Sequence, residues 1–129
     1  MTKPVLTAVA LFNLAMAVFI FLWPMWFYEA VPGVAQTGAF NSHFLRDVAL
    51  AYLVSGAALW VAAAQGVRAL GVFGAAWPVL HALFHIWIWA AMRGAAVDLV
   101  ALANLFGIQL PAWAALIAAL HLGEQEAGR

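Results

Sequence analysis

Four long uncharged blocks, separated by short segments that contain charged residues, dominate the pattern of hydrophobic and polar positions. The blocks lie between Lys3 and Glu29 (25 residues), Asp47 and Arg68 (20), Arg68 and Arg93 (24), and Asp98 and Glu124 (25). A helix needs about 20 apolar residues to cross a hydrocarbon core about 30 Å thick. The pattern therefore predicts four transmembrane helices, at about residues 4–28, 43–65, 69–92 and 98–123.

The connections between these blocks predict how the helices are arranged. The turn near residues 65–68 is short, so the second and third helices become antiparallel neighbours, and small residues in both predict close packing. Pro78 lies inside the third helix and Pro111 inside the fourth, where proline lacks the N–H that the helix needs. We expect a single all-α domain over residues 1–129, an integral membrane bundle of four helices with a Pro-kinked third helix.

Helix boundaries are marked by capping residues and turn signals. Pro32 and Gly33 mark a turn, and Asn41 or Ser42 can cap the second transmembrane helix. Asp98 is suited to the start of the fourth helix. Gly107 and Pro111 interrupt that helix, which predicts either a kink or a short interfacial helix followed by a short span.

Composition places the chain among integral membrane proteins, and charge constrains its partners. Hydrophobic residues make up 68% of the chain and charged residues 8%, whereas soluble domains are about half apolar and a quarter charged. Five basic and five acidic residues cancel, so the basic surface of a nucleic-acid-binding protein is absent and the lipid bilayer is the expected partner. There are no cysteines, which excludes disulfides and thiolate sites.

The distribution of basic residues predicts the orientation in the membrane. Four spans put both termini on one side, together with Lys3, Arg68 and Arg129, and leave Arg46 and Arg93 on the other. Because positive charge is enriched in cytoplasmic segments, we expect cytoplasmic termini in a multi-pass protein.

Two pairs of polar residues at helical spacing form the candidate site. His43 and Asp47 are four residues apart, as are His81 and His85, and that spacing places each pair on one helix face. The stripe in the third helix continues from Trp77 through both histidines to Trp89. Folding the second and third helices about a turn at Gln65 or Val67 brings Asp47 level with or close to His85 in either case.

Imidazole and carboxylate groups in this pattern are typical of a metal site. His43, Asp47, His81 and His85 are the predicted ligands of a divalent metal ion, zinc or iron, with Asp47 and His85 as candidate catalytic residues. Haem is an alternative, with one histidine from each helix as axial ligands. The pattern is similar to the ligand sets of intramembrane zinc hydrolases and membrane hydroxylases. The hydroxylases use more histidines, and the hydrolases have more spans, so no property is transferred from either.

Structural explanations of the same residues stay open. Asp47 can pair with Arg46 or Arg93 at the interface, and histidines can join helices by hydrogen bonds. Asn13 is expected to bond a neighbouring helix, and His121 to lie at the opposite end of the fourth span. Two further residues, Asn104 and Asp98, share a side with the cluster and could extend it.

Three functions are compatible with the sequence. The leading hypothesis is a small membrane protein with an intramembrane metal or haem site that, if it is an enzyme, acts on a lipid-soluble substrate. The first alternative is a non-catalytic accessory or scaffold subunit of a larger membrane complex. The second is a proton-coupled transporter or channel that works as a homo-oligomer, with activity titrating near the histidine pKa of about 6.5.

Overall fold

A computed structural model describes residues 1–123 and is helical, with no strand in that part of the chain. Four helical stretches are long and apolar enough to cross a membrane: Thr2–Leu22, Ser42–Gln65, Arg68–Met92 and Leu99–Leu120. Arg129, one of the residues used to predict the orientation, lies outside the described residues.

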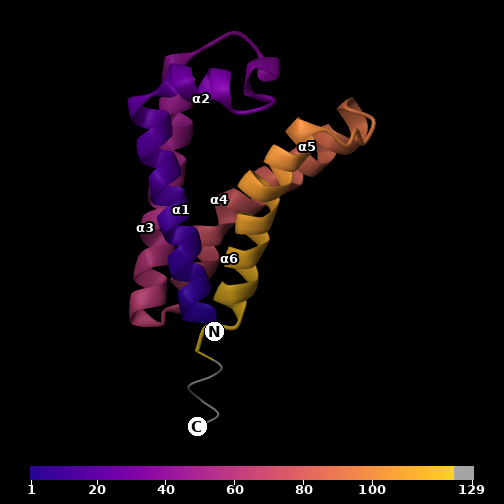
Figure 1. Cartoon of the computed structure of the whole chain (residues 1–129). Helices are drawn as coiled ribbons and strands as arrows, with labels where there is room; N and C mark the ends of the chain where they lie inside the picture. The colour runs from indigo at the N-terminus through magenta and orange to yellow at the C-terminus, as the bar shows by residue number, and fades with distance from the viewer. Residues whose placement is uncertain (124–129) are drawn as a thin grey trace.

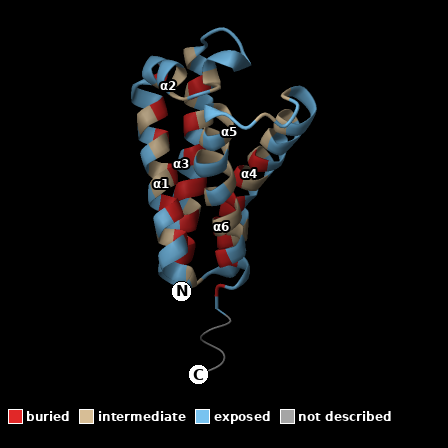
Figure 2. Ribbon diagram, turned by 45° about the vertical axis from the view of Figure 1, so that its right-hand side comes forward, coloured by how far each residue is buried: buried red, intermediate tan, exposed pale blue. Residues whose placement is uncertain are grey.

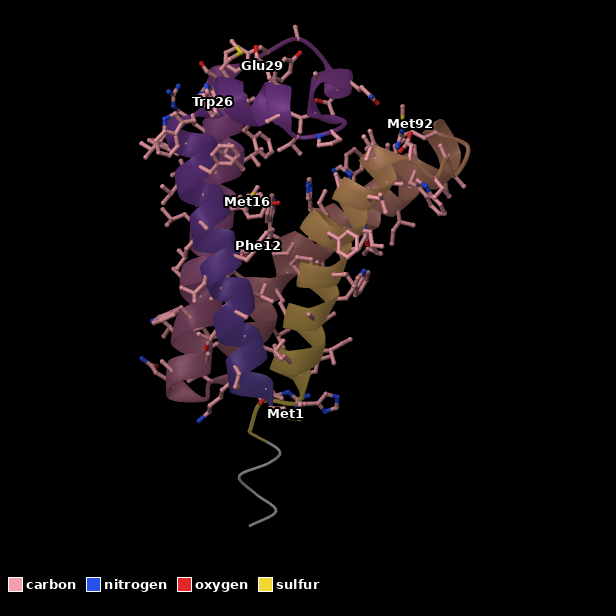
Figure 3. All side chains as sticks on the ribbon, in the orientation of Figure 1. Met1, Phe12, Met16, Trp26, Glu29 and Met92 are labelled. Atoms are coloured by element: carbon pink, nitrogen blue, oxygen red, sulfur yellow. The ribbon has the colours of Figure 1, made fainter. Side chains whose placement is uncertain are left out.

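The first transmembrane stretch is shorter than predicted. Helix α1 (Thr2–Leu22) ends where Trp23 leaves the helical conformation, and Pro24 begins the short helix α2 (Pro24–Ala30). Proline has no N–H to continue the hydrogen bonds of α1 but fits the first turn of a new helix. Three consecutive aromatic residues, Trp26, Phe27 and Tyr28, therefore belong to α2, and Figure 3 shows Trp26 at the end of the molecule away from Met1.

The second and third stretches form a hairpin with the expected signals at its ends. After the 3-10 turn η1 (Val34–Thr37), helix α3 (Ser42–Gln65) begins at Asn41, whose side chain accepts hydrogen bonds from the N–H groups of His43 and Phe44. The prediction of a cap at this position is confirmed. Gly66 has a φ of 72° and ends α3 in the left-handed conformation that favours glycine. Helix α4 (Arg68–Trp87) follows and continues into the π-helical turn η2 (Ile88–Met92).

The fourth stretch is helical from Leu99 to Leu120, but a π-helical turn that contains Gly107 interrupts its α-helical hydrogen bonding, whereas a kink at Pro111 stays a prediction. It consists of α5 (Leu99–Asn104), the π-helical turn η3 (Leu105–Gln109) and α6 (Leu110–Leu120), with Pro111 in the first turn of α6. Asp98 caps α5 by accepting a hydrogen bond from the N–H of Ala101, which confirms the predicted start of this helix.

The helices pack in two pairs. Helix α1 contacts α3, α4 contacts α6, and the pairs meet through contacts of α3 with α4 and of α1 with α6. Small residues allow the close approach: Gly71 lies against Ala119 and Ala62, and Gly74 against α3. A shared core joins all four helices near the chain ends, and Figure 2 shows its buried residues where the helices face one another.

Away from this core the two pairs separate. In Figures 1 and 2, α4 leans away from α1 and α3 towards the end that carries α2 and α5. A second, smaller core lies within the α1–α3 pair, around Ile20, Leu45 and Tyr52. At that end the connection between α2 and α3 contacts α5, since a Cβ placed on Gly33 would come within 2.6 Å of a Val100 methyl group. The candidate site lies between these two regions of contact.

Candidate functional site

His81 and His85 lie together on one face of α4. Their ring centroids are 4.5 Å apart in an edge-on arrangement, and the ring of Trp77 stacks on His81 at 5.1 Å. Both histidines are half-buried, and within residues 1–123 neither imidazole has a hydrogen-bond partner. The predicted stripe along α4 is thus continuous from Trp77 to His85, and its imidazole nitrogens are open to a ligand.

His43 and Asp47 form a separate pair at the start of α3. Nδ1 of His43 lies 3.9 Å from Oδ1 of Asp47, and the two side chains are 89% and 59% exposed. The expected pairing of neighbours along the helix is present. The pair lies at the surface, in the first two turns of α3, and not in the packed interior.

The register of α3 and α4 matches the folding of the hairpin about Gln65. Ser55 is level with Gly74, to whose carbonyl it donates a hydrogen bond, and Tyr52 is level with Trp77, at 4.8 Å between ring centroids. Continued along both helices, the same register puts Asp47 level with the turn from His81 to His85.

The two pairs of polar residues are nevertheless not assembled into one ligand set. Within residues 1–123 no group of three or more His, Asp or Glu side chains is close enough to hold a metal ion. The prediction treated α3 and α4 as neighbours along their whole length, whereas the two helices diverge beyond the contact of Tyr52 with Trp77 (Figure 1). The length of the turn predicted which residues of α3 and α4 lie level with one another. It did not predict the angle between the two helices.

A chain of buried hydrogen bonds joins α1, α3 and α4 just below the histidines. Because Pro78 has no N–H, the carbonyl of Gly74 has no partner within α4, and the Ser55 hydroxyl donates to it at 2.6 Å. The side-chain amide of Asn13 donates in turn to the Ser55 oxygen at 3.0 Å. The expected bond of Asn13 to a neighbouring helix is confirmed, and the carbonyl that Pro78 frees is satisfied from the next helix.

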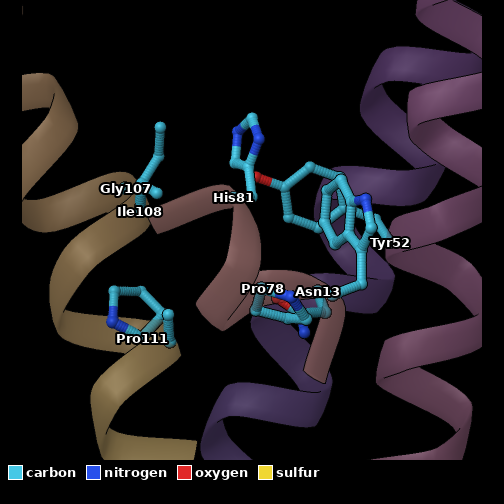
Figure 4. Close-up of a pocket in the computed structure, with 9 residues that line it drawn as sticks. Asn13, Tyr52, Pro78, His81, Gly107, Ile108 and Pro111 are labelled. Carbon is cyan, nitrogen blue, oxygen red and sulfur yellow. The ribbon is translucent and has the colours of Figure 1, made fainter. Parts of the chain in front are cut away.

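A small cavity lies between this chain and His81. It is lined by residues of α1, α3, α4, η3 and α6, and its volume is about 10 Å³. Figure 4 shows His81 and Tyr52 beside one another, above Pro78 and Asn13, with Pro111 across from them. Both prolines, Pro78 within α4 and Pro111 in the first turn of α6, therefore line the cavity.

The arginines at this end do not pair with Asp47. The Nε of Arg46 donates to the carbonyl of Phe21 at the end of α1, and its guanidinium lies over the ring of Phe21. Arg93 binds Asp98, with 2.6 Å between Nη2 and Oδ2. This guanidinium, together with the N–H of Ala101, lowers the pKa of the Asp98 carboxyl.

The polar residues of the interrupted fourth stretch serve packing within the α4–α6 pair. Nε2 of Gln109 donates to the carbonyl of Ala82 and to Oδ1 of Asn104, and its Oε1 accepts from the indole of Trp113. Neither Asn104 nor Asp98 extends the histidine cluster. Sequence reasoning missed Gln109, and the available signal was an amide directly beside the interruption at Pro111.

Tyr52 is a further residue that sequence reasoning missed. It is 8% exposed, contacts Trp77 and lines the cavity. Its phenol is one turn from Ser55 on the same helix, and this second polar group in the middle of the span was the available signal. His121 lies just past α6, at the other end of the molecule from the candidate site.

No protein-family model, curated protein or solved structure matches this chain. The functional argument therefore depends on the geometry of the site alone.

Proposed function

We propose that the chain is an integral membrane protein, a bundle of four transmembrane helices with antiparallel neighbours. The four long apolar helices and the apolar residues exposed around them, such as Leu11, Phe73 and Leu80, support this proposal, because lipid tails cover such surfaces. Pro78 bends the third span and Pro111 the fourth. The termini are cytoplasmic, and the site lies towards the outer face.

We propose further that the protein binds a divalent metal ion, zinc or iron, or a haem, through His81 and His85. The observation that supports this function is the pair of adjacent imidazoles inside a span, with no hydrogen-bond partner among the described residues. Polar groups without partners are costly in lipid, and ionisable residues within spans typically have a functional role. Two histidines four residues apart on one helix can bind one metal.

Asp47 and His43 complete the ligand set in this proposal. The register puts Asp47 level with the two histidines, so closure of the gap between α3 and α4 brings the carboxylate towards them. With three or four protein ligands, the metal would polarise a lipid-soluble substrate or a bound water, the chemistry of catalytic metal sites. Asp47 and His85 are the residues that we assign to catalysis if the protein is an enzyme.

Metal analysis and absorption spectra of the detergent-purified chain test this function. We expect stoichiometric zinc or iron, or the strong absorption of haem, in the natural chain, and loss of at least nine-tenths of it in the double variant His81→Ala/His85→Ala. His121→Ala is the matched control and keeps its metal, because His121 lies at the other end of the molecule. The metal content of the variants His43→Ala and Asp47→Asn measures how much the residues of α3 contribute to metal binding.

A metal-free, colourless protein whose stability does not change in a chelator would overturn the proposal. The accessory-subunit hypothesis would then predict stoichiometric co-purification with a membrane partner, unchanged by the double histidine variant. One structural observation counts against that alternative: Gly56, Gly71 and Gly74, which could have formed an intermolecular surface, pack within this chain. A proton-coupled homo-oligomer would instead show transport that titrates near pH 6.5.

A further inference from the structure

The hydrogen bonds beneath the cavity beside His81 have a fixed direction, which determines the polar atom that Asn13 has left for the cavity. A carbonyl only accepts, so the Ser55 hydroxyl must use its proton on Gly74. The Ser55 oxygen is then the acceptor of the bond to Asn13, and Asn13 must present its NH₂ group there. The amide oxygen, Oδ1 of Asn13, is consequently left without a partner in this chain of bonds.

This oxygen opens onto the cavity. Asn13 is 2% exposed and lines the cavity. Within residues 1–123, Oδ1 takes part in no hydrogen bond, yet no fully buried side-chain nitrogen or oxygen there lacks a partner. The small open surface of Asn13 therefore includes Oδ1. The same argument applies to the hydroxyl of Tyr52, which is also buried and also lines the cavity.

Size and polarity together specify the occupant. A cavity of about 10 Å³ is at the size of one water molecule, which needs about 10–15 Å³, so the group that enters it is small. The occupant must donate to Oδ1 of Asn13. It can also accept from the Tyr52 hydroxyl and contact the imidazole of His81. A hydroxyl group meets these requirements, and a hydrocarbon does not.

We infer that this cavity is a binding site for a single hydroxyl group, which donates to Oδ1 of Asn13 and accepts from the hydroxyl of Tyr52. The hydroxyl belongs either to a water molecule or to the end of a lipid-soluble alcohol whose tail extends between the helix pairs. The site adjoins the proposed metal or haem site, because His81 lines the cavity, but its two hydrogen-bonding residues, Asn13 and Tyr52, are not among the proposed metal ligands.

The first test is an experimental structure of the full chain at a resolution that shows ordered water. We expect an oxygen atom within the distance of an O–H···O hydrogen bond, about 2.5–3.0 Å, of Oδ1 of Asn13. A cavity with no oxygen at that distance overturns the inference, whatever other measurements give.

The second test distinguishes the two sources of the hydroxyl. The melting temperature of the chain in phosphatidylcholine nanodiscs is compared in 1-octanol and in octane at equal membrane concentration. If an alcohol binds, octanol raises the melting temperature above that in octane. Tyr52→Phe, which removes one hydroxyl and keeps the ring, abolishes that difference. Tyr28→Phe is the matched control and keeps it, because the Tyr28 hydroxyl binds the carbonyl of Gly38 outside the cavity.

If octanol and octane act alike while the oxygen is present, the occupant is water. The same hydroxyl site is then supported with water as its ligand. Because no arm of either experiment alters His81 or His85, failure of this inference is separable from failure of the metal or haem proposal.

Discussion

The few polar side chains buried in this apolar chain are arranged around one missing backbone donor. Pro78 frees the carbonyl of Gly74, Ser55 of α3 donates to that carbonyl, and Asn13 of α1 donates to the Ser55 oxygen. In a lipid environment an unsatisfied carbonyl costs several kcal/mol. The positions of Ser55 and Asn13 are therefore explained by the proline in a third helix.

This explanation predicts that Ser55 and Pro78 are energetically coupled. Ser55→Ala leaves the Gly74 carbonyl without a donor, and we expect the free energy of unfolding to fall by about 1 kcal/mol. In a Pro78→Ala background the restored N–H of residue 78 can bond Gly74, so the same serine substitution should have almost no effect. Reversible unfolding in detergent–SDS mixtures measures all four chains of this double-mutant cycle.

Thr7→Val is the control for the loss of a hydroxyl. Thr7 also donates to a backbone carbonyl, that of Lys3, but from an exposed position on α1. Its substitution should change the unfolding free energy by less than about 0.5 kcal/mol. Additive effects of Ser55→Ala and Pro78→Ala would contradict the assigned role of Ser55.

At the level of single residues, the sequence showed which polar groups require a hydrogen-bond partner better than it showed which residue provides that partner. The freed Gly74 carbonyl and a partner for Asn13 on another helix both follow from residue chemistry, and both are observed. That one serine meets both needs depends on distances of a few ångströms between three helices, which sequence spacing does not encode. For the same reason Tyr52 and His81 were not expected to line a common cavity.

The helix ends follow local rules and were largely predictable. Asn41 and Asp98 both cap helices, because their side-chain oxygens accept the N–H groups that a first turn leaves unpaired. The break between α1 and α2 follows from Pro24. The π-helical turns η2 and η3 were not predicted, because widening a turn by one residue depends on packing around it and has no specific sequence signal.

The first turn of α5 should become less stable at acid pH. The pKa of Asp98 is lowered in the folded chain, so its contribution to stability is complete above the unfolded pKa of about 3.9 and is lost as pH falls through the lower folded value. We expect the amide protection factor of Ala101 to decrease as pH is lowered from 6 to 3. Hydrogen exchange, corrected for the intrinsic rate at each pH, measures this change.

Asp98→Asn provides the comparison for this experiment. The asparagine keeps an oxygen that can cap Ala101 but has no carboxylate to titrate against Arg93. Its protection factor at Ala101 should be independent of pH over the same range. An equal acid response in both chains would show that Asp98 is not the responsible group.

At the scale of the whole molecule, two helix pairs are joined by a common core and separate beyond it. The four long apolar helices and their order were predictable from the charge spacing, since each uncharged block has the roughly 20 residues that a helix needs to cross the hydrocarbon core of a bilayer. The separation of the pairs was not, because it depends on the angle at which α4 leaves α1 and α3, which charge spacing does not encode. This separation keeps Asp47 away from the histidine pair.

If a metal binds as proposed, the pairs should approach one another. The chain has no natural cysteine, so spin labels on Phe44→Cys and Leu83→Cys, two exposed positions on α3 and α4, report only the distance across the opening. Pulsed electron paramagnetic resonance should show a shorter distance after Zn²⁺ is added. The shortening should be lost in a chain that also carries His81→Ala.

Labels on Leu11→Cys and Phe73→Cys serve as the reference pair. Both positions are exposed on α1 and α4, on the lengths of these helices that pack in the common core. Their distance should not change with Zn²⁺. A metal-dependent change in this pair alone would contradict closure of the opening and indicate rearrangement of the core.

The hydrogen bonds of Asn13, Ser55 and Gly74 also bear on the order in which the chain is built. If the proposed membrane protein is inserted one helix at a time, the first span enters the bilayer with an amide whose partner, Ser55, arrives only with the second span. Ser55 in turn finds its acceptor only when the third span, which contains Gly74, has followed. An unpaired amide is unfavourable in hydrocarbon, so each newly inserted span is held by the one before it. The polar residues thus link insertion of the spans to their assembly, in the order in which a ribosome delivers them.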